Sequence, residues 1–229
     1  MEYLKTATPK RLDSDFFDRD ARVLAQDLLG KVLQVRQDNQ WLFSRIIETE
    51  AYLINERGSH ASLGNTYSRR ALFMPPGTIY MYYARGGDSL NFSCQGEGNA
   101  VLIKSAFPLA HSEQDQESVA LMLANNPLKN GKPRPLEKVC AGQTLLCRAM
   151  GLRVPDWNAR QLDEDTFTMI DDFYNPSQII QSTRLGIPPH RDAHLPYRFI
   201  DARYTKYSTK NPLSVRNWQN GKEYTIFSP

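Results

Sequence analysis

The feature that most constrains the fold is a succession of strand-like segments between residues 31 and 107. Residues 31–36 show the alternation of side-chain polarity that is typical of a strand, and Asp38 and Asn39 are suited to a turn. Residues 41–52 then form a long run rich in β-branched side chains. Three shorter segments follow at 78–83, 89–94 and 100–107, separated by the glycine-containing stretches 85–88 and 95–98. This spacing predicts a β-meander, in which consecutive strands pair with their neighbours.

Helical patterns flank this strand-rich region. Asp18 is a plausible N-cap for a helix that buries Ala21, Leu24, Ala25 and Leu28 on one face and stops at Gly30. Further helices are expected at 112–124 and 144–150, and a strand at 177–185. Residues 1–11 show no clear pattern and are expected to be loosely ordered. No repeat or linker divides the remainder, so we expect one α+β domain over residues 12–229.

Composition narrows the class of protein only moderately. Of 229 residues, 41% are hydrophobic and 23% charged, and the net charge of +3 permits nucleic-acid binding without requiring it. Cys94, Cys140 and Cys147 are too few and too widely spaced for a disulfide framework, so buried free thiols and a reducing compartment are expected. No secretory signal or membrane-spanning run is present. These features predict a soluble intracellular protein, located in the cytoplasm or nucleoid of a bacterium or in a eukaryotic nucleus.

The segment most suggestive of chemistry contains two acids inside a strand pattern, Glu48 and Glu50. Side chains two residues apart on a strand point to the same face. A functional interpretation makes one of them a general base at the mouth of a pocket, because carboxylates are rarely buried without a role or a partner. The periodicity alone favours the alternative, a solvated strand face that carries two surface acids.

Aromatic and basic residues follow the acidic strand. Tyr80 and Tyr82 share one face of their strand and Tyr83 occupies the other, and tyrosine beside arginine can stack on a base and contact phosphate. Considered alone, the strand is more typical of an ordinary half-buried sheet. Arg69 and Arg70 are adjacent and can neutralise phosphates, although solvated surface charge is the default for any single basic residue.

The sequence argues against a metal centre. His190 and His194 are loosely spaced like metal ligands, but no third histidine or cysteine completes a site and the segment carries prolines. No phosphate-binding loop, dinucleotide fingerprint, serine-hydrolase elbow or zinc-protease motif is present. We therefore expect neither a metal nor another cofactor.

Several motifs, taken in chain order, resemble those of the alkyladenine (3-methyladenine) DNA glycosylase family. They are IETEAY at 47–52, His60, FMPPGTIY at 73–80, Asn91, QGEG at 95–98 and VLIK at 101–104. The resemblance extends over nearly the whole chain, and the ETEAY, PGT and QGxG elements are a specific combination. It implies a single α+β domain with a curved, mainly antiparallel β-sheet flanked by helices.

The resemblance assigns roles residue by residue. The second acid of ETEAY, Glu50, corresponds to the catalytic carboxylate that orients the attacking water. The base pocket maps onto Tyr52, His60, Tyr82, Asn91 and Leu102. Among these, Tyr82 is expected to stack on the flipped base and Asn91 to screen purines by steric exclusion.

Three positions depart from the family pattern. Lys104 stands where the family often has an arginine that helps to hold the catalytic water, and a lysine lacks the bidentate fork. The wedge tyrosine, which fills the gap left by the flipped nucleotide, has no clear counterpart, so Tyr83 or Arg85 is the candidate. Finally, a GPGKL-like element that contacts DNA reads GQTLL at 142–146.

The implied enzyme acts in base excision repair. It flips an alkylated or deaminated purine out of double-stranded DNA and hydrolyses the N-glycosidic bond, leaving an abasic site. No pocket lysine is indicated as a nucleophile, so a monofunctional enzyme without lyase activity is expected, and the resemblance suggests a monomer. The alternatives are a non-catalytic reader of damaged or bent DNA on the same scaffold and, more distantly, a small-molecule hydrolase that uses Glu48 and Glu50.

Overall fold

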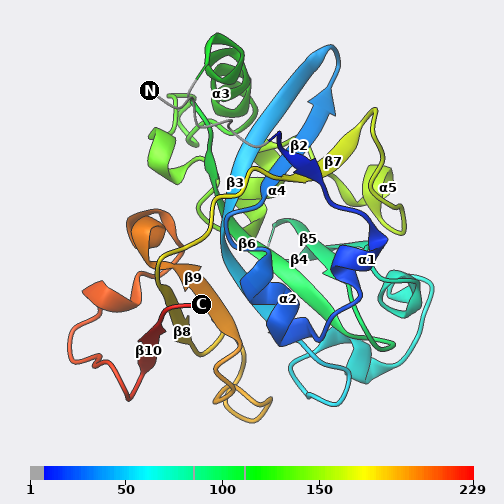
Figure 1. The fold of residues 1–229 in the computed structure, drawn as a ribbon, viewed down its shortest axis with the longest axis vertical. Coiled ribbons are helices and arrows are strands. Elements are labelled where there is room, and N and C mark those ends of the chain that lie inside the picture. Colours follow the sequence, from blue (N-terminus) through cyan, green and yellow to red (C-terminus); the bar gives the residue numbers. More distant parts are fainter. Residues whose placement is uncertain (1–7, 85, 111) are drawn as a thin grey trace, which may run out of the picture.

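The computed structural model describes residues 8–84, 86–110 and 112–229, and their arrangement is shown in Figure 1. In this part of the chain ten strands form one antiparallel sheet with the main order β1-β7-β2-β3-β6-β5-β4. The strands are β1 (Lys10–Arg11), β2 (Val32–Gln37), β3 (Gln40–Tyr52), β4 (Ile79–Ala84), β5 (Gly87–Ser93), β6 (Ala100–Pro108), β7 (Phe167–Asp171), β8 (Ile179–Ser182), β9 (Arg198–Asp201) and β10 (Tyr224–Phe227). β9, β8 and β10 branch from β3 in that order.

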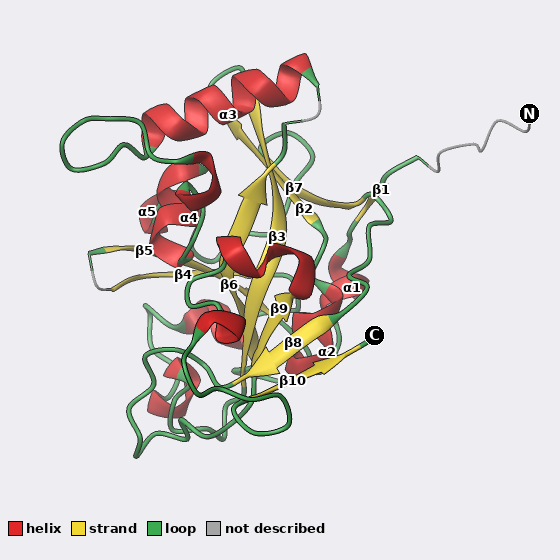
Figure 2. Cartoon of the chain, turned by 90° about the vertical axis from the view of Figure 1, so that its left-hand side faces the viewer, coloured by secondary structure: helices red, strands yellow, loops and turns green. Residues whose placement is uncertain are grey.

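Short helices cover the sheet. They are α1 (Ser14–Phe17), α2 (Ala21–Asp27), α3 (Glu113–Asn125), α4 (Gln143–Ala149) and α5 (Val154–Trp157), with 3-10 helices η1 (His60–Leu63), η2 (Arg70–Phe73), η3 (Leu136–Lys138), η4 (Ala202–Tyr207) and η5 (Pro212–Ser214). Figure 2 shows the β4–β5 hairpin reaching out to one side of the molecule, below α3 and α4. No helix in the described ranges is long and apolar enough to cross a membrane.

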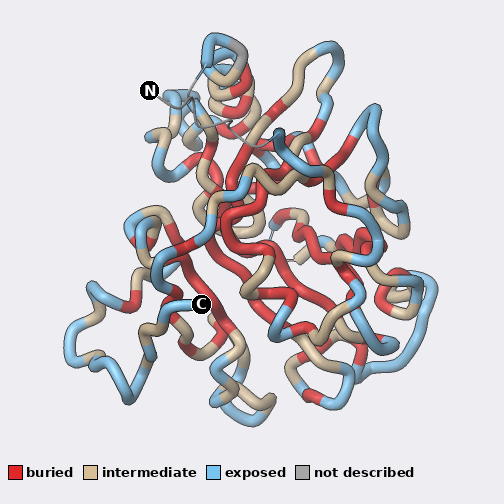
Figure 3. Tube along the Cα trace, in the orientation of Figure 1, coloured by how far each residue is buried: buried red, intermediate tan, exposed pale blue. Residues whose placement is uncertain are grey.

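The long strand β3 organises the sheet. Its first half pairs with β2, and its second half pairs with β6 on one edge and with β9 on the other. The hydroxyl of Thr49 donates a hydrogen bond to the carbonyl of Ala25 on α2 at 2.6 Å, so α2 covers the face of β3 that bears Thr49. Figure 3 shows that the central strands are buried along most of their length. Glu50 follows Thr49 on β3, so its side chain is directed to the face opposite α2.

The mixed α+β class and the mainly antiparallel sheet agree with the sequence-based prediction. The predicted free, buried state of Cys94, Cys140 and Cys147 is confirmed, and burial raises the pKa of the Cys94 and Cys140 thiols to about 12. Within the segment expected to be loosely ordered, residues 1–7 lie outside the described residues and Lys10–Arg11 form β1.

Two local predictions were wrong. The N-cap of α2 is Asp20 rather than Asp18, because the Asp20 carboxylate accepts a hydrogen bond from the backbone N–H of Arg22, whereas Asp18 ends the short helix α1. The turn between β4 and β5 is also shorter than residues 85–88, since Gly87 already pairs with Ala84.

Candidate active site

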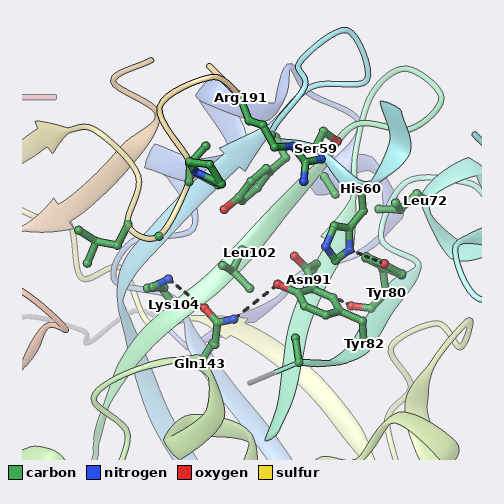
Figure 4. A pocket seen from close by; sticks show the side chains of 18 residues that line it. Ser59, His60, Leu72, Tyr80, Tyr82, Asn91, Leu102, Lys104, Gln143 and Arg191 are labelled. Atoms are coloured by element: carbon green, nitrogen blue, oxygen red, sulfur yellow. Dashed lines mark hydrogen bonds between the residues drawn. The ribbon is translucent and has the colours of Figure 1, made fainter. Parts of the chain in front are cut away.

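A cavity of about 270 Å³ opens between β4, β5, β6, the start of α4 and two loops at 58–60 and 185–191. All five predicted base-pocket residues line it, namely Tyr52, His60, Tyr82, Asn91 and Leu102, together with Lys104, which was predicted to act beside the catalytic water. Tyr80 and Gln143, which had no assigned role, line it as well, and Figure 4 shows both among the labelled side chains.

Strand register brings these residues together. Glu50 on β3 is the partner of Leu102 on β6, Leu102 is the partner of Asn91 on β5, and Asn91 is the partner of Tyr80 on β4. Directly paired residues of antiparallel strands point to the same face. Four adjacent strands thus form one lateral row that runs from a carboxylate to a tyrosine across the cavity floor.

Glu50 lies immediately behind the cavity wall. It is 0% exposed, and it contacts two wall residues: its Oε2 accepts a hydrogen bond from the Tyr52 hydroxyl at 2.7 Å, and its Oε1 is 3.4 Å from the Lys104 Nζ. The backbone N–H of Leu185 donates to Oε1 at 3.2 Å. Burial and the neighbouring Glu50 charge raise the pKa of Tyr52 well above its ordinary value, so this hydroxyl remains a donor.

Lys104 follows Leu102 by two residues on β6, so strand alternation directs it to the same cavity face, and the sheet is irregular at this point. The β3–β6 register shifts between Glu48 and Thr49, which pair with Ser105 and Ile103 and leave Lys104 without a partner on β3. The ammonium donates a hydrogen bond to the Gln143 Oε1 at 2.9 Å. Lys104 thus lines the cavity at the position expected beside the catalytic water, and its ammonium is held in an ion pair and a hydrogen bond.

Three aromatic side chains form the opposite wall. The His60 ring lies 4.4 Å from the Tyr82 ring between centroids, and the Tyr80 and Tyr82 rings are 5.6 Å apart. The His60 Nδ1 is 2.9 Å from the Tyr80 hydroxyl oxygen. Burial, assisted by the charges of Arg69 and Arg191, lowers the pKa of His60 below its ordinary value, so the ring is neutral at pH 7.

Glu48 has a different environment from Glu50. It is also 0% exposed and pairs with the fully buried Arg198, whose Nε lies 2.6 Å from the Glu48 Oε1. Ser105 and Thr209 donate further hydrogen bonds to the carboxylate. Burial opposes the charged form, but Arg198 and these donors outweigh it and lower the pKa of Glu48. The interpretation favoured by periodicity, two solvated surface acids, is therefore wrong for both residues.

Three of the predicted DNA-contacting residues, Arg69, Arg70 and Tyr83, do not line the cavity. Tyr83, near the end of β4, is 68% exposed, and Arg85 lies outside the described residues. Arg69 donates hydrogen bonds to the carbonyls of Leu63 and Gly64, and Arg70 to the carbonyl of Tyr67. These contacts brace the loop that joins η1 to η2, and the identity of the wedge stays a prediction. Among the described residues, no group of three metal-ligating side chains lies close enough together to hold a metal ion.

Known proteins resemble this chain over most of its length. The profile of the methylpurine-DNA glycosylase family matches residues 15–205. A protein of Pseudomonas fluorescens is 57% identical over 221 residues, which cover 96% of this chain and 95% of the relative. Relatives from Pseudomonas savastanoi pv. phaseolicola and Pseudomonas aeruginosa are 56% identical over 216 residues and 55% identical over 215 residues, covering 94% of this chain and 96% and 90% of those proteins. All three are named "Putative 3-methyladenine DNA glycosylase".

The chain belongs to the methylpurine-DNA glycosylase family. By that membership it is a DNA repair glycosylase, and the resemblance drawn from its motifs is confirmed.

Proposed function

We propose that this glycosylase extrudes an alkylated or deaminated purine, with 3-methyladenine as the reference substrate, from duplex DNA into the tyrosine-lined cavity. A water molecule aimed by Glu50 then hydrolyses the N-glycosidic bond. The observation that carries the proposal is the position of the Glu50 carboxylate, buried beside the cavity and hydrogen-bonded to the Tyr52 hydroxyl at 2.7 Å. A reader of bent DNA needs no buried carboxylate beside such a cavity, so its presence favours the enzyme.

The chemistry follows from the charges of the participants. Extruding a base costs a few kcal/mol, and stacking against Tyr52 and Tyr82 offsets part of that cost. A purine alkylated at N3 or N7 is a cation, which aromatic faces attract. The alkylated purine takes the electron pair of the breaking bond and departs neutral, while positive charge develops on the sugar. Glu50 stabilises that charge and accepts a proton from the water that attacks the anomeric carbon.

Access to Glu50 requires movement. In the described arrangement the carboxylate is sealed from solvent by its contacts with Tyr52, Lys104 and Leu185. Entry of the base must therefore displace Tyr52 or Lys104 far enough for one water molecule to reach Glu50. The Lys104 ammonium is paired with Glu50 and hydrogen-bonded to Gln143, and an amine in the ammonium form has no lone pair to attack an abasic aldehyde. We therefore propose a monofunctional enzyme.

The test is base release from duplex DNA treated with dimethyl sulfate, with the released bases identified by mass spectrometry. The wild-type chain is expected to release free 3-methyladenine and leave abasic sites uncleaved in the absence of added base or nuclease. Glu50→Gln is expected to bind the same DNA but to release base at least about 100-fold more slowly. Binding without release by the wild type would support the non-catalytic reader, and normal release by Glu50→Gln would remove Glu50 from the reaction.

A further inference from the structure

Gln143, the first residue of α4, connects three parts of the site. Its Oε1 accepts the hydrogen bond from the Lys104 Nζ at 2.9 Å, and its Nε2 donates to the Ser89 hydroxyl on β5 at 2.9 Å. The same Nε2 lies 3.5 Å from the hydroxyl oxygen of Tyr82, and Figure 4 shows Gln143 between Lys104 and Tyr82. One amide thus bridges the cation beside Glu50 and the aromatic wall.

The distances indicate which contact holds the ammonium of Lys104. The Lys104 Nζ is 3.4 Å from the Glu50 Oε1, longer than a usual direct hydrogen bond, but only 2.9 Å from the Gln143 Oε1. A lysine carries a compact charge on a flexible stem and lacks the rigid fork of arginine. An additional acceptor is therefore needed to fix where the Lys104 charge stands relative to the carboxylate.

Gln143 is itself firmly oriented. Lysine has only donors, so the amide oxygen must face Lys104 and the amide nitrogen must face Ser89, which is buried. The preceding residue, Gly142, donates its backbone N–H to the Ser105 hydroxyl at 3.0 Å, and Ser105 in turn donates to Glu48. The buried Glu48 network thus fixes the start of α4, and with it the base of the Gln143 side chain.

We propose that Gln143 is a positioning residue of the active site. Its amide oxygen holds the Lys104 ammonium beside Glu50, and its amide nitrogen holds the Tyr82 ring against the extruded base. The inference rests on the proposed function, because it concerns how Lys104 and Glu50 together place the water. Gln143 acts through Lys104 and Tyr82 and need not touch the reacting atoms. Its loss should slow bond cleavage while leaving DNA affinity nearly unchanged.

The experiment compares single-turnover base release from a duplex containing one 7-methylguanine with affinity for a duplex containing a tetrahydrofuran abasic-site analogue. Gln143→Met keeps the length of the side chain but removes its strong acceptor and both donors. We expect an approximately tenfold slower release, the size of one hydrogen bond to a charged group, and a dissociation constant within about twofold of the wild type. Gln37→Ala is the matched control, since the half-buried Gln37 amide pairs with Asn125 and does not line the cavity.

Rescue separates positioning from a merely structural role. Lys104→Arg supplies a fork that can reach Glu50 unaided, so the fold loss of rate caused by Gln143→Met should be much smaller in the Lys104→Arg background than in the wild-type background. Equal effects of Lys104→Arg in both backgrounds would overturn the inference. If Gln143→Met does not fold, Gln143→Asn, which withdraws the amide by one methylene, must show the same slow release and the same rescue. A wild type that releases no base refutes the proposed function itself, whereas Gln143 variants with wild-type rates overturn this inference alone.

Discussion

Glu48 and Glu50 are two residues apart on β3, and both are sealed from solvent. The Glu48 oxygens are occupied by Arg198, Ser105 and Thr209, all of them held by the fold. Two of the neighbours of Glu50, Tyr52 and Lys104, line the cavity, so base entry can rearrange them. We therefore expect the two acids to have separable roles, with Glu48 stabilising the fold and Glu50 serving the proposed reaction.

Glu48→Gln is the corresponding test at the residue scale. The change leaves the buried Arg198 without a charged partner, so it should lower the free energy of unfolding by about 3–5 kcal/mol. Urea unfolding measures this loss, and base release per folded molecule should stay close to the wild-type rate. A stable Glu48→Gln protein that cannot release base would contradict the assignment.

His60 gives a second residue-scale prediction, which concerns pH. Its pKa is lowered on folding, so between the unfolded value of 6.5 and the lower folded value the unfolded chain binds a proton that the folded chain does not. The free energy of unfolding should therefore fall as pH drops below 6.5 and level off below the folded pKa. Urea unfolding from pH 8 to pH 5 should show this slope in the wild type and lose it in His60→Gln. The contribution of Glu48, with its lowered pKa, lies below its ordinary 4.5 and is separate.

Sequence motifs predicted most cavity residues because strand alternation carries their geometry. Once ETEAY and the YxY strand are placed in a sheet, Tyr52 and Tyr82 fall on the cavity side. Gln143 had no such signal, because its role depends on the approach of α4 to β5, which no local pattern encodes. At the sequence level it appeared only as a departure from the family pattern, as did Lys104. The structure shows that these two departures contact each other.

At the scale of elements, the contact between β5 and α4 sets the position of Gln143. Gly87 begins β5, and a Cβ built there would lie 2.0 Å from the Cγ2 of Thr144 on α4. The glycine was interpreted as part of a turn, but its function is to let a helix approach a strand. The close approach also places Gln143 within reach of Ser89.

Gly87→Ala should therefore force β5 and α4 apart. We expect a loss of about 1–3 kcal/mol in unfolding free energy together with slower base release, because Gln143 moves with α4. Thr144→Ala in the same chain removes the nearest clashing atom and should recover part of both losses. An unchanged midpoint of urea unfolding in Gly87→Ala would show that β5 and α4 can accommodate the added methyl group.

A strand or helix could be predicted from the sequence where a local pattern of side chains marks it. β2 to β6, α3 and α4 fall within about two residues of their predicted positions because alternation or helical spacing marks them. β9 was missed because Arg198 and Asp201, two charged residues of a four-residue strand, are buried. The strand exists because β3 and β8 lie on either side of it, and such long-range pairing leaves no local trace.

At the scale of the whole molecule, the C-terminal segment closes the fold. Residues after 205 lie beyond the family match, yet Thr209 donates two hydrogen bonds to Glu48 and the carbonyl of Lys210 accepts one from Arg198. β10 then pairs with β8. The C-terminal segment therefore helps to hold the strand that carries Glu50.

Truncation tests this closure. A chain ending at Trp218 loses the β8–β10 pairing and the packing of Phe227 but keeps the contacts of Thr209 and Lys210. A chain ending at Ser208 deprives Glu48 of two donors, which should cost about 1.5–3 kcal/mol for each hydrogen bond to this charged group. The two chains should therefore have clearly different midpoints of thermal unfolding. Equal midpoints would show that the contacts of Thr209 with Glu48 do not stabilise the fold.

The burial of the Glu50 carboxylate also affects which molecules the enzyme can hydrolyse. A free nucleoside offers no phosphodiester chain to grip, so it gains too little binding energy to push aside the side chains that shield the acid. Modified monomers in the nucleotide pool should therefore survive in the presence of the enzyme, while the same lesion embedded in a chromosome is removed. The preference for DNA over a free nucleoside would then arise because Glu50 is buried, and not because the base itself is recognised differently.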